Sequence, residues 1–297
     1  GGQFGEPVAL TESEIAEIVR RVAQCAAAVQ AAGFTGVQVH AAHGYLLSQF
    51  LSPRSNQRSD RYGGDLSNRA RMLLEVVAAV RAAVGPGFPV AVKLNSADFQ
   101  KGGFDFEDSL QVALWLEQAG VDLLEISGGN YEQPKLLGVE GLEEEETQDV
   151  AQSTILREAY FVDFALAMKA RVSMPLMVTG GFRRREAMEQ AIAGGGADLI
   201  GIGRPMCVMT DAPSRLLSGE AQLPRYEDSL SLFPRWLAFL NSSKLLRTLA
   251  TFSLQYWYYA QLEELGVNGA AAPGMSVIAA SRKVLSRQKA LLLEKGS

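Results

Sequence analysis

Alternating helical and extended patterns run along the first two thirds of the chain. Residues 12–32 carry apolar side chains at helical spacing, begin at the capping box formed by Thr11 and Glu14, and end at Gly33. A short β-branched run over residues 37–40 follows directly and predicts a buried strand. The first predicted unit is therefore a helix that leads into a strand.

The same alternation repeats four more times. In each repeat a helical pattern precedes a short apolar run, and a polar or glycine-rich stretch follows that run. The four predicted helix–strand pairs are 66–83 with 89–95, 106–119 with 121–127, 156–170 with 175–181, and 184–193 with 197–203. Because these strands read as apolar on both faces, the pattern predicts a parallel sheet covered by helices, either doubly wound or a (β/α)8 barrel.

Past Pro205 the character of the chain changes. Prolines interrupt helical stretches there, and no further strand pattern is evident. We therefore expect two parts, a partial barrel over residues 1–210 and a helical extension over residues 211–297. The four consecutive aromatic residues 256–259 cannot share one helix face, so part of this cluster is expected to pack on the body or on another subunit.

Composition narrows the class of protein. The 297 residues are 47% hydrophobic and 21% charged, which is typical of a soluble globular protein. A net charge of −5 argues against a nucleic-acid partner. Cys25 and Cys207 are the two cysteines, too few for an iron–sulfur cluster or a structural cysteine-rich zinc site. With no apolar run long enough for a membrane span, the sequence predicts a cytoplasmic protein without a membrane partner.

Both histidines of the chain follow the first predicted strand. His40 and His43 stand in the stretch HAAHGY, which ends in Tyr45. In parallel α/β folds ligands bind at the carboxyl ends of strands, so this placement favours a functional role. Two alternatives stay open, a metal pair and two hydrogen-bonded loop histidines, but the HxxH spacing alone is a weak metal signal.

Lys93 ends the second predicted strand. A cation that emerges from an apolar run needs an anion or a polar ligand close by. From the residues alone, an ion pair across the sheet with Glu125 and a ligand contact are equally favoured.

Glycine-rich loops follow the fourth and fifth predicted strands. Gly180 and Gly181 lie in the first loop, and Gly203 precedes Arg204 in the second. Glycines let backbone N–H groups approach an anion closely, a following helix N-terminus favours negative charge, and an arginine adds a bidentate contact. Together the two loops predict a phosphate site. No GxGxxG motif follows any predicted strand, so a dinucleotide-binding Rossmann domain is not indicated.

The stretch HAAHGYLLSQFLSPRSNQRSDRYGGDLSNRARMLLEVV, residues 40–77, resembles the signature of the old yellow enzyme family of NADH:flavin oxidoreductases. The segments VAVKLNSADF, ISGGNYE, VTGGF and IGIGRPM occur in the order typical of that family, and the resemblance covers residues 6–225. It implies a (β/α)8 barrel that binds FMN at its carboxyl end. It also implies that NAD(P)H reduces the flavin, which then reduces the activated C=C bond of an α,β-unsaturated carbonyl compound.

The resemblance assigns roles to individual residues. His40 and His43 resemble the pair that hydrogen-bonds the substrate carbonyl oxygen, where negative charge develops during hydride transfer. Tyr45 resembles the proton donor to the α-carbon, and a phenol keeps its proton at neutral pH. The positions that resemble cofactor-binding residues are Lys93, beside the flavin pyrimidine, and Gly180, Gly181, Gly203 and Arg204, at the FMN phosphate.

Other signature residues are expected to brace the loop rather than to act in catalysis. They are Asn56, Arg58, Asp60, Tyr62, Gly63, Asn68 and Arg69. Because only two cysteines are present, the chain is not expected to belong to the subgroup that carries an iron–sulfur cluster.

Five strands are predicted where the family's barrel has eight, and the amino-terminal units are the ones without counterparts. Strand edges near Val39 and Ile202 are then expected to be unpaired. The open explanations are a fragment of a longer protein, half of a split enzyme, or a homo-oligomer that closes its own edges. A non-catalytic half-barrel that needs a partner segment is the alternative function, and a barrel enzyme for a phosphorylated metabolite is a third.

Overall fold

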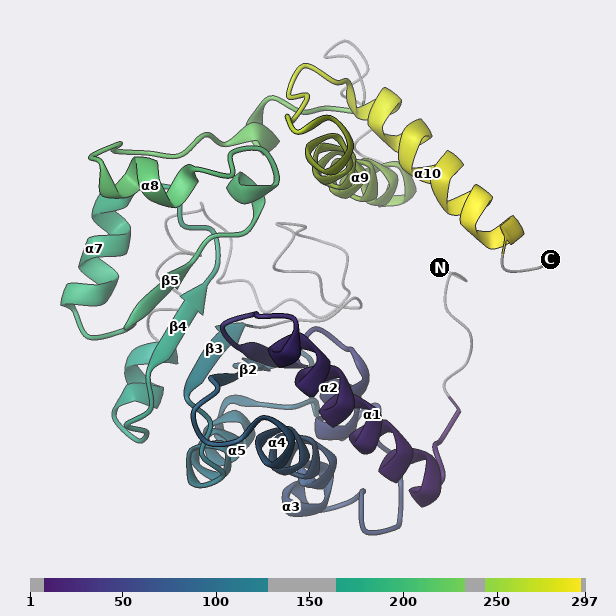
Figure 1. The fold of residues 1–297 in the computed structure, drawn as a ribbon, viewed down its shortest axis with the longest axis vertical. Helices are drawn as coiled ribbons and strands as arrows, with labels where there is room; N and C mark the ends of the chain where they lie inside the picture. The colour runs from purple at the N-terminus through teal and green to yellow at the C-terminus, as the bar shows by residue number, and fades with distance from the viewer. Residues whose placement is uncertain (1–7, 128–163, 233–243, 295–297) are drawn as a thin grey trace. The chain divides into compact units, whose positions relative to one another are not determined.

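The computed structural model describes residues 8–127, 164–232 and 244–294 of the chain. The chain folds into two compact units, and each is described by itself. Of the described residues, the first unit holds 8–127, 164–180 and 191–200, and the second holds 181–190, 201–232 and 244–294 (Figure 1).

The first described helix and strand are those that the amino-terminal pattern predicts. Helix α1 spans Glu12–Ala31, with Thr11 as its N-cap and the reciprocal contacts of the capping box to Glu14. Strand β1 follows at Val37–Ala41. The connection from β1 to β2 contains helices α2 (Leu46–Leu51), α3 (Leu66–Arg69) and α4 (Arg71–Val84). The helix predicted over residues 66–83 is thus two helices that meet at Ala70, and α2 was not predicted.

The remaining strands also lie where the sequence predicts them, with shorter bounds. They are β2 (Val90–Asn95), β3 (Leu123–Ser127), β4 (Leu176–Thr179) and β5 (Leu199–Gly201), with α5 (Phe106–Gln118) between β2 and β3 and α7 (Arg185–Ala193) between β4 and β5. Residues 164–169 are helical, and the rest of the helix predicted over 156–170 lies largely outside the described residues.

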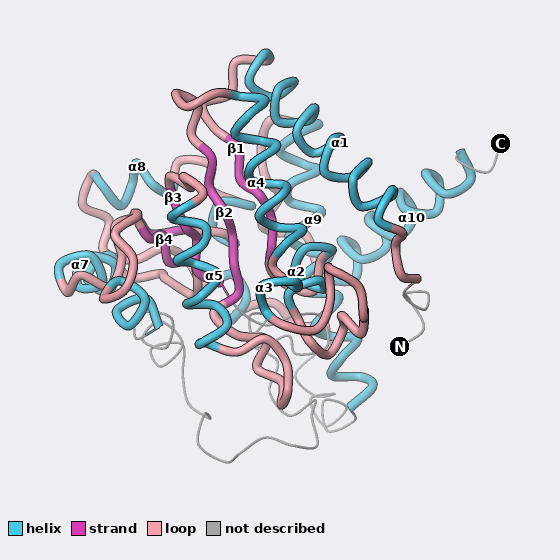
Figure 2. Tube along the Cα trace, turned by 90° about the horizontal axis from the view of Figure 1, so that it is seen from below, coloured by secondary structure: helices cyan, strands magenta, loops and turns pink. Residues whose placement is uncertain are grey.

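The five described strands form one sheet in the order β1-β2-β3-β4-β5, and the pairs from β1 to β4 are parallel. Figure 2 shows α1, α4 and α5 on the same side of β1, β2 and β3. A doubly wound sheet reverses its strand order and carries helices on both faces, whereas a barrel adds each strand beside the previous one. The observed order is therefore that of a barrel wall, with β1 and β5 as its edges in the described part of the chain.

The two faces of this sheet differ in polarity. Val39, Val92 and Leu124 are aligned across β1, β2 and β3 and are buried on one face of the sheet. The opposite face carries a polar row, so the expectation of strands apolar on both faces is wrong for β1 to β3. Lysine and glutamate are tolerated at these positions because they pair with each other, as shown below.

The second unit contains the helical extension. Its elements after β5 are η2 (Arg204–Cys207), α8 (Ala212–Leu217), η3 (Tyr226–Asp228), α9 (Lys244–Asn268) and α10 (Val277–Glu294). Trp257 of α9 is fully buried against Val277 and Val284 of α10, and its indole N–H donates to the Met275 carbonyl at 2.8 Å. Tyr259 is 44% exposed, so the aromatic cluster divides between helix faces as predicted.

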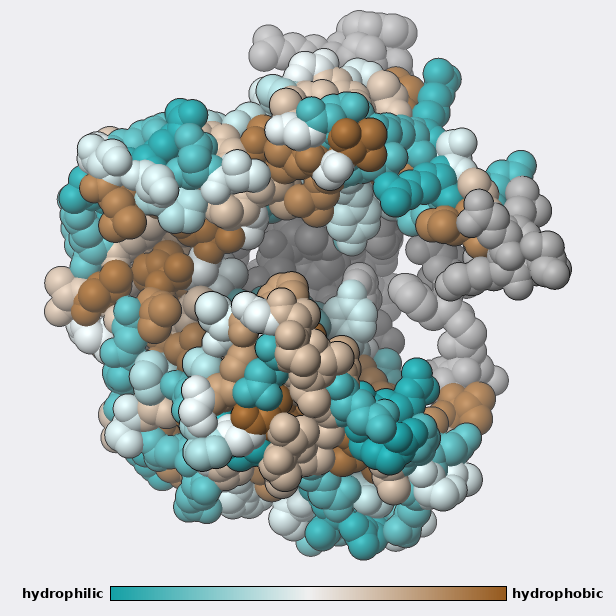
Figure 3. Space-filling model, in the orientation of Figure 1, coloured by the Kyte–Doolittle hydropathy of each residue, from teal (hydrophilic) through white to brown (hydrophobic). Residues whose placement is uncertain are grey.

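Hydrophobic residues also reach the surface, where Figure 3 shows them gathered in patches. Leu199, on the edge strand β5, is 44% exposed, and Leu217 at the end of α8 is 86% exposed. Among the described helices, none combines the length and the hydrophobicity that crossing a membrane requires.

Candidate active site

A row of polar side chains crosses the face of the sheet opposite α1, α4 and α5. His40 on β1 is paired in register with Lys93 on β2, which is paired with Glu125 on β3. Residues paired in this way share a face of a parallel sheet. Gln38, two residues before His40, also lies on this face and donates from Nε2 to Glu125 Oε2 at 2.8 Å. Four polar side chains from three strands therefore lie next to one another.

Lys93 and Glu125 form an ion pair within this row. Lys93 Nζ lies 2.7 Å from Glu125 Oε1, and the two side chains are 19% and 6% exposed. Burial opposes ionisation of Glu125, but Lys93 first, and then the side chains of Thr179 and Gln38, hold its pKa below the usual value. The ion pair that the sequence left open is thus confirmed, and the cofactor contact predicted for Lys93 stays a prediction.

The loop after β1 brings His40, His43 and Tyr45 together. The ring centroid of His40 lies 5.3 Å from that of His43 and 4.9 Å from that of Tyr45. His43 and Gly44 both adopt positive φ, at 62° and 74°, which turns the chain sharply from β1 toward α2. The turn leaves His40 and Tyr45 exposed and His43 partly buried.

The environment disfavours the charged form of both histidines. For His43, burial and then the positive charge of Lys93 lower the pKa to about 4, against the opposing effect of Glu125. Burial and Lys93 also lower the pKa of His40. At neutral pH both imidazoles are therefore neutral, and each carries one N–H.

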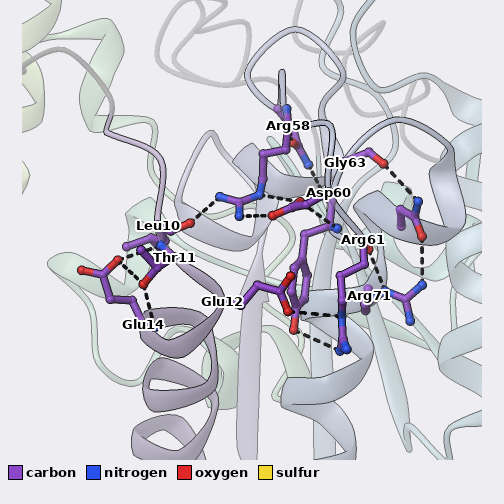
Figure 4. Close-up of polar contacts among 12 residues, drawn as sticks. Leu10, Thr11, Glu12, Glu14, Arg58, Asp60, Arg61, Gly63 and Arg71 are labelled. Atoms are coloured by element: carbon purple, nitrogen blue, oxygen red, sulfur yellow. Dashed lines mark hydrogen bonds and ion pairs between the residues drawn. The ribbon is translucent and has the colours of Figure 1, made fainter.

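Polar contacts brace the signature loop between α2 and α4, as the sequence predicts. Asn56 donates from Nδ2 to the carbonyls of Phe50 and Tyr62, each at 2.7 Å. Arg58 pairs with Asp60 and donates to the Leu10 carbonyl at 2.6 Å, which ties the loop to the start of α1 (Figure 4).

Two further contacts of this loop explain why it needs these residues. A Cβ on Gly63 would lie 2.1 Å from the Arg58 carbonyl oxygen, so only glycine fits there. Arg69 is buried and donates to the carbonyls of Leu51 and Gly64 and to Asp108 at 3.0 Å. Asp108 on α5 was not predicted, because its partner lies 39 residues away in the sequence.

The predicted phosphate-binding residues fall at the ends of β4 and β5. Gly180 follows β4 in the first unit, whereas Gly181, with φ of 73°, Gly203 and Arg204 belong to the second. The element that Arg204 begins is a 3-10 helix of four residues. The helix dipole invoked for this loop is therefore not supported, because so short an element has few aligned peptide units.

Within the second unit Arg204 belongs to a charged cluster. Glu227 lies 2.9 Å from Arg183 and 3.3 Å from Arg204, and it accepts a hydrogen bond from the Tyr258 hydroxyl at 2.9 Å. Although burial opposes ionisation, the backbone amide of Glu227 and then both arginines hold its pKa below the usual value. Two guanidinium groups and one carboxylate leave one excess positive charge, and Arg204 is 38% exposed. This donor set fits an added phosphate.

Three residues of these clusters were not assigned a role from the sequence: Ser127 and Asn95, which are buried, and Glu227, which is partly buried. Ser127 contacts His43, Asn95 accepts a hydrogen bond from the His43 backbone, and Glu227 joins the two arginines. Ser127 lies in the segment ISGGNYE, which supports the family resemblance but does not indicate what the serine does. Nothing in the local sequence indicates a function for Glu227. In the described ranges no group of three potential metal ligands is found.

Comparison with known proteins places these residues in a family. The profile of the NADH:flavin oxidoreductase / NADH oxidase family matches residues 3–222, and the chain belongs to this family. A NADH-dependent flavin oxidoreductase of Neonectria sp. (strain DH2) is 43% identical over 206 residues, 69% of this chain and 26% of the relative. An NADH oxidase of Thermoanaerobacter brockii is 34% identical over 215 residues, 72% of this chain and 31% of the relative.

Solved structures agree with the fold. Morphinone reductase in complex with tetrahydroNAD matches with a TM-score of 0.55 at 29% identity, over 74% of this chain and 54% of that one. A 2-naphthoyl-CoA reductase complex matches with a TM-score of 0.65 at 28% identity, over 74% of this chain and 31% of that one. The predicted fold class, a partial (β/α)8 barrel with a helical extension, is confirmed. The chain spans about a quarter to a half of the length of the curated relatives it matches.

Proposed function

We propose that this chain carries the substrate site and part of the FMN site of an oxidoreductase that uses NAD(P)H to reduce activated C=C bonds of α,β-unsaturated carbonyl compounds. The observation that supports it most is the convergence of His40, His43 and Tyr45 at the carboxyl end of β1, beside Lys93. The description of the family names NADH and flavin, the reductant and cofactor expected from the sequence.

Each unit contains residues whose chemistry fits one end of FMN. Arg204, with the excess positive charge of its cluster and the flexible backbone at Gly203, would hold the phosphate. Lys93 would contact the flavin pyrimidine, since its ammonium has three N–H donors and Glu125 takes one of them. When bound, the flavin supplies hydride to the alkene after reduction by NAD(P)H.

The histidines would polarise the substrate. Negative charge develops on the carbonyl oxygen as the C=C bond is reduced, and N–H donors fixed beside that oxygen stabilise the transition state. Neutral imidazoles can serve, because each still has one N–H to donate. The strand β1 and the turn at His43 hold the two rings 5.3 Å apart, which suits two donors converging on one oxygen.

Tyr45 would supply the proton that completes the reaction at the α-carbon. Its ring is 46% exposed and lies 4.9 Å from the His40 ring, so the phenol stands beside the proposed carbonyl site and within reach of a ligand. A hydroxyl in this position is a general acid for a developing carbanion.

Separate measurement of the two half-reactions tests this function. Tyr45→Phe should leave flavin reduction by NADH nearly unchanged and slow reoxidation by cyclohexenone about 100-fold or more, the usual contribution of a positioned acid. Tyr259→Phe is the matched control, because that tyrosine has similar exposure but lies on α9. Equal slowing of both half-reactions by Tyr45→Phe would contradict the assignment.

A further inference from the structure

Ser127 lies at the end of β3 and contacts His43 directly. Its hydroxyl oxygen is 2.6 Å from His43 Nε2, and the residue is 2% exposed. On the neighbouring strand Asn95, which is paired in register with Ser127, accepts a hydrogen bond from the His43 backbone N–H at 3.2 Å. Two strands therefore hold His43, one at its backbone and one at its ring.

These contacts fix a residue in an uncommon conformation. His43 has a φ of 62°, a value that few residues other than glycine adopt and that persists where the surroundings determine it. Asn95 is itself fixed, since it donates to Asp98 at 3.1 Å and its carbonyl accepts from Ser109 at 2.8 Å. The arrangement thus holds the imidazole of His43 in one place at the edge of the site.

The direction of the hydrogen bond follows from the chemistry of the serine. A buried hydroxyl proton needs an acceptor. In the part of the chain that the structure describes, His43 Nε2 is the hydrogen-bond partner of the Ser127 hydroxyl. If Nε2 carried the proton instead, the hydroxyl proton would have no acceptor among the described residues. The serine therefore donates, Nε2 accepts, and the imidazole proton resides on Nδ1.

We propose that Ser127 is a positioning residue that selects the Nδ1–H tautomer of His43 and so leaves Nδ1 as the donor to the substrate carbonyl oxygen. The substrate step rests on the proposed function, whereas the tautomer does not. Free imidazole side chains favour the opposite tautomer, so the serine contact has a measurable consequence.

Neighbouring charges make the choice of tautomer decisive. Burial first, and then Lys93 on β2 and His40 on β1, disfavour the doubly protonated ring, whereas Glu125 on β3 favours it. The ring is thus neutral at neutral pH and has one N–H, so the serine decides which nitrogen can donate.

The test is long-range ¹H–¹⁵N correlation NMR of the ¹⁵N-labelled full chain at neutral pH. The chain has two histidines, so His40→Gln assigns both rings. We expect a pyrrole-type shift for His43 Nδ1 and a pyridine-type shift for Nε2. Ser127→Ala should move both signals toward the Nε2–H tautomer, and Ser127→Thr should restore them. A pyrrole-type Nε2 in the unmodified chain, or unmoved signals in a folded Ser127→Ala variant, would overturn the proposal.

A second readout separates this proposal from the proposed function. In flavin-loaded protein, Ser127→Ala should slow reoxidation by cyclohexenone about fivefold to tenfold, the value of one neutral hydrogen bond, and leave reduction by NADH unchanged. Failure to bind FMN would contradict the proposed function alone, because the tautomer is read without cofactor. The predicted tautomer with an unchanged rate of reoxidation in the Ser127→Ala variant would refute the role of Nδ1 as donor.

Discussion

Replacing Lys93 by Met would leave the Glu125 carboxylate buried without its cation, beside the polar side chains of Thr179 and Gln38. At 2.7 Å the gross attraction of the pair is about 6 kcal/mol at an effective dielectric constant of about 20. The net loss is smaller, because Glu125 can take up a proton, and protonating an ordinary glutamate at pH 7 costs about 4 kcal/mol. We therefore expect Lys93→Met to lower the free energy of unfolding by about 3–4 kcal/mol at pH 7.

The same reasoning predicts a pH dependence. The pKa of Glu125 is lowered in the folded protein, so the pair stabilises the fold above the unfolded pKa and loses this contribution as pH falls through the folded value. The penalty of Lys93→Met should accordingly shrink to about 1 kcal/mol near pH 5, where a lone carboxyl is protonated at little cost. Glu125→Gln should lower the free energy of unfolding by about 1–3 kcal/mol. The double variant, with both Lys93→Met and Glu125→Gln, should lower it by less than the sum of the two single changes.

Urea unfolding followed by circular dichroism measures these differences, and hydrogen exchange of the β2 and β3 amides assigns them to the sheet. The matched control is Lys169→Met, since Lys169 lies 2.6 Å from Asp198 in a pair whose side chains are 26% and 39% exposed. That change should cost less than about 1 kcal/mol. Equal losses for the two lysine variants, with no pH dependence, would refute the buried pair as a stabilising element.

Four further outcomes follow from the structure. Arg204→Ala should weaken FMN retention about tenfold or more in equilibrium dialysis, and unchanged affinity would remove its phosphate role. Gly63→Ala should lower the free energy of unfolding, measured in urea, by about 1–3 kcal/mol. Gly87→Ala, where an added Cβ meets no atom within 4 Å, should change it by less than about 0.5 kcal/mol. Equal effects would contradict the close approach of Gly63 to the Arg58 backbone. Because the folded pKa of His43 is about 4, below its unfolded value, stability should fall by up to about 3 kcal/mol as pH drops from about 6.5 to 4, and His43→Gln should lose this slope. Arg69→Leu should cost about 3–5 kcal/mol in the same assay by leaving Asp108 and two carbonyls unpaired, and a loss below about 1 kcal/mol would argue against a bracing role.

Local patterns were sufficient to predict most of the fold. The spacing of apolar residues and the capping box at Thr11 placed α1, and each β-branched run placed a strand. The sequence left open whether the sheet was doubly wound, because strand order is a property of pairing between distant segments. The pair of Lys93 with Glu125 was one of two open expectations, but the polar face as a whole was missed, because Gln38 and His40 join that pair only once β1, β2 and β3 pair in register.

In the candidate site too, contacts between residues close in sequence were predictable and contacts between distant residues were not. His40, His43 and Tyr45 stand in one loop, so their proximity is visible in the sequence. Ser127 contacts His43 across 84 positions, and Glu227 meets Arg183 across 44, so neither partner could be identified from local pattern. The helix N-terminus expected after Gly203 was wrong, because the chain forms a single 3-10 turn at Arg204–Cys207 there.

The most direct test of the proposed function is the visible absorption spectrum of the full chain after incubation with FMN and desalting. We expect a retained flavin band that NADH bleaches without oxygen and that cyclohexenone restores. Bleaching without restoration by the enone would contradict alkene reduction, and a folded chain that retains no flavin would contradict the claim that these residues bind the cofactor.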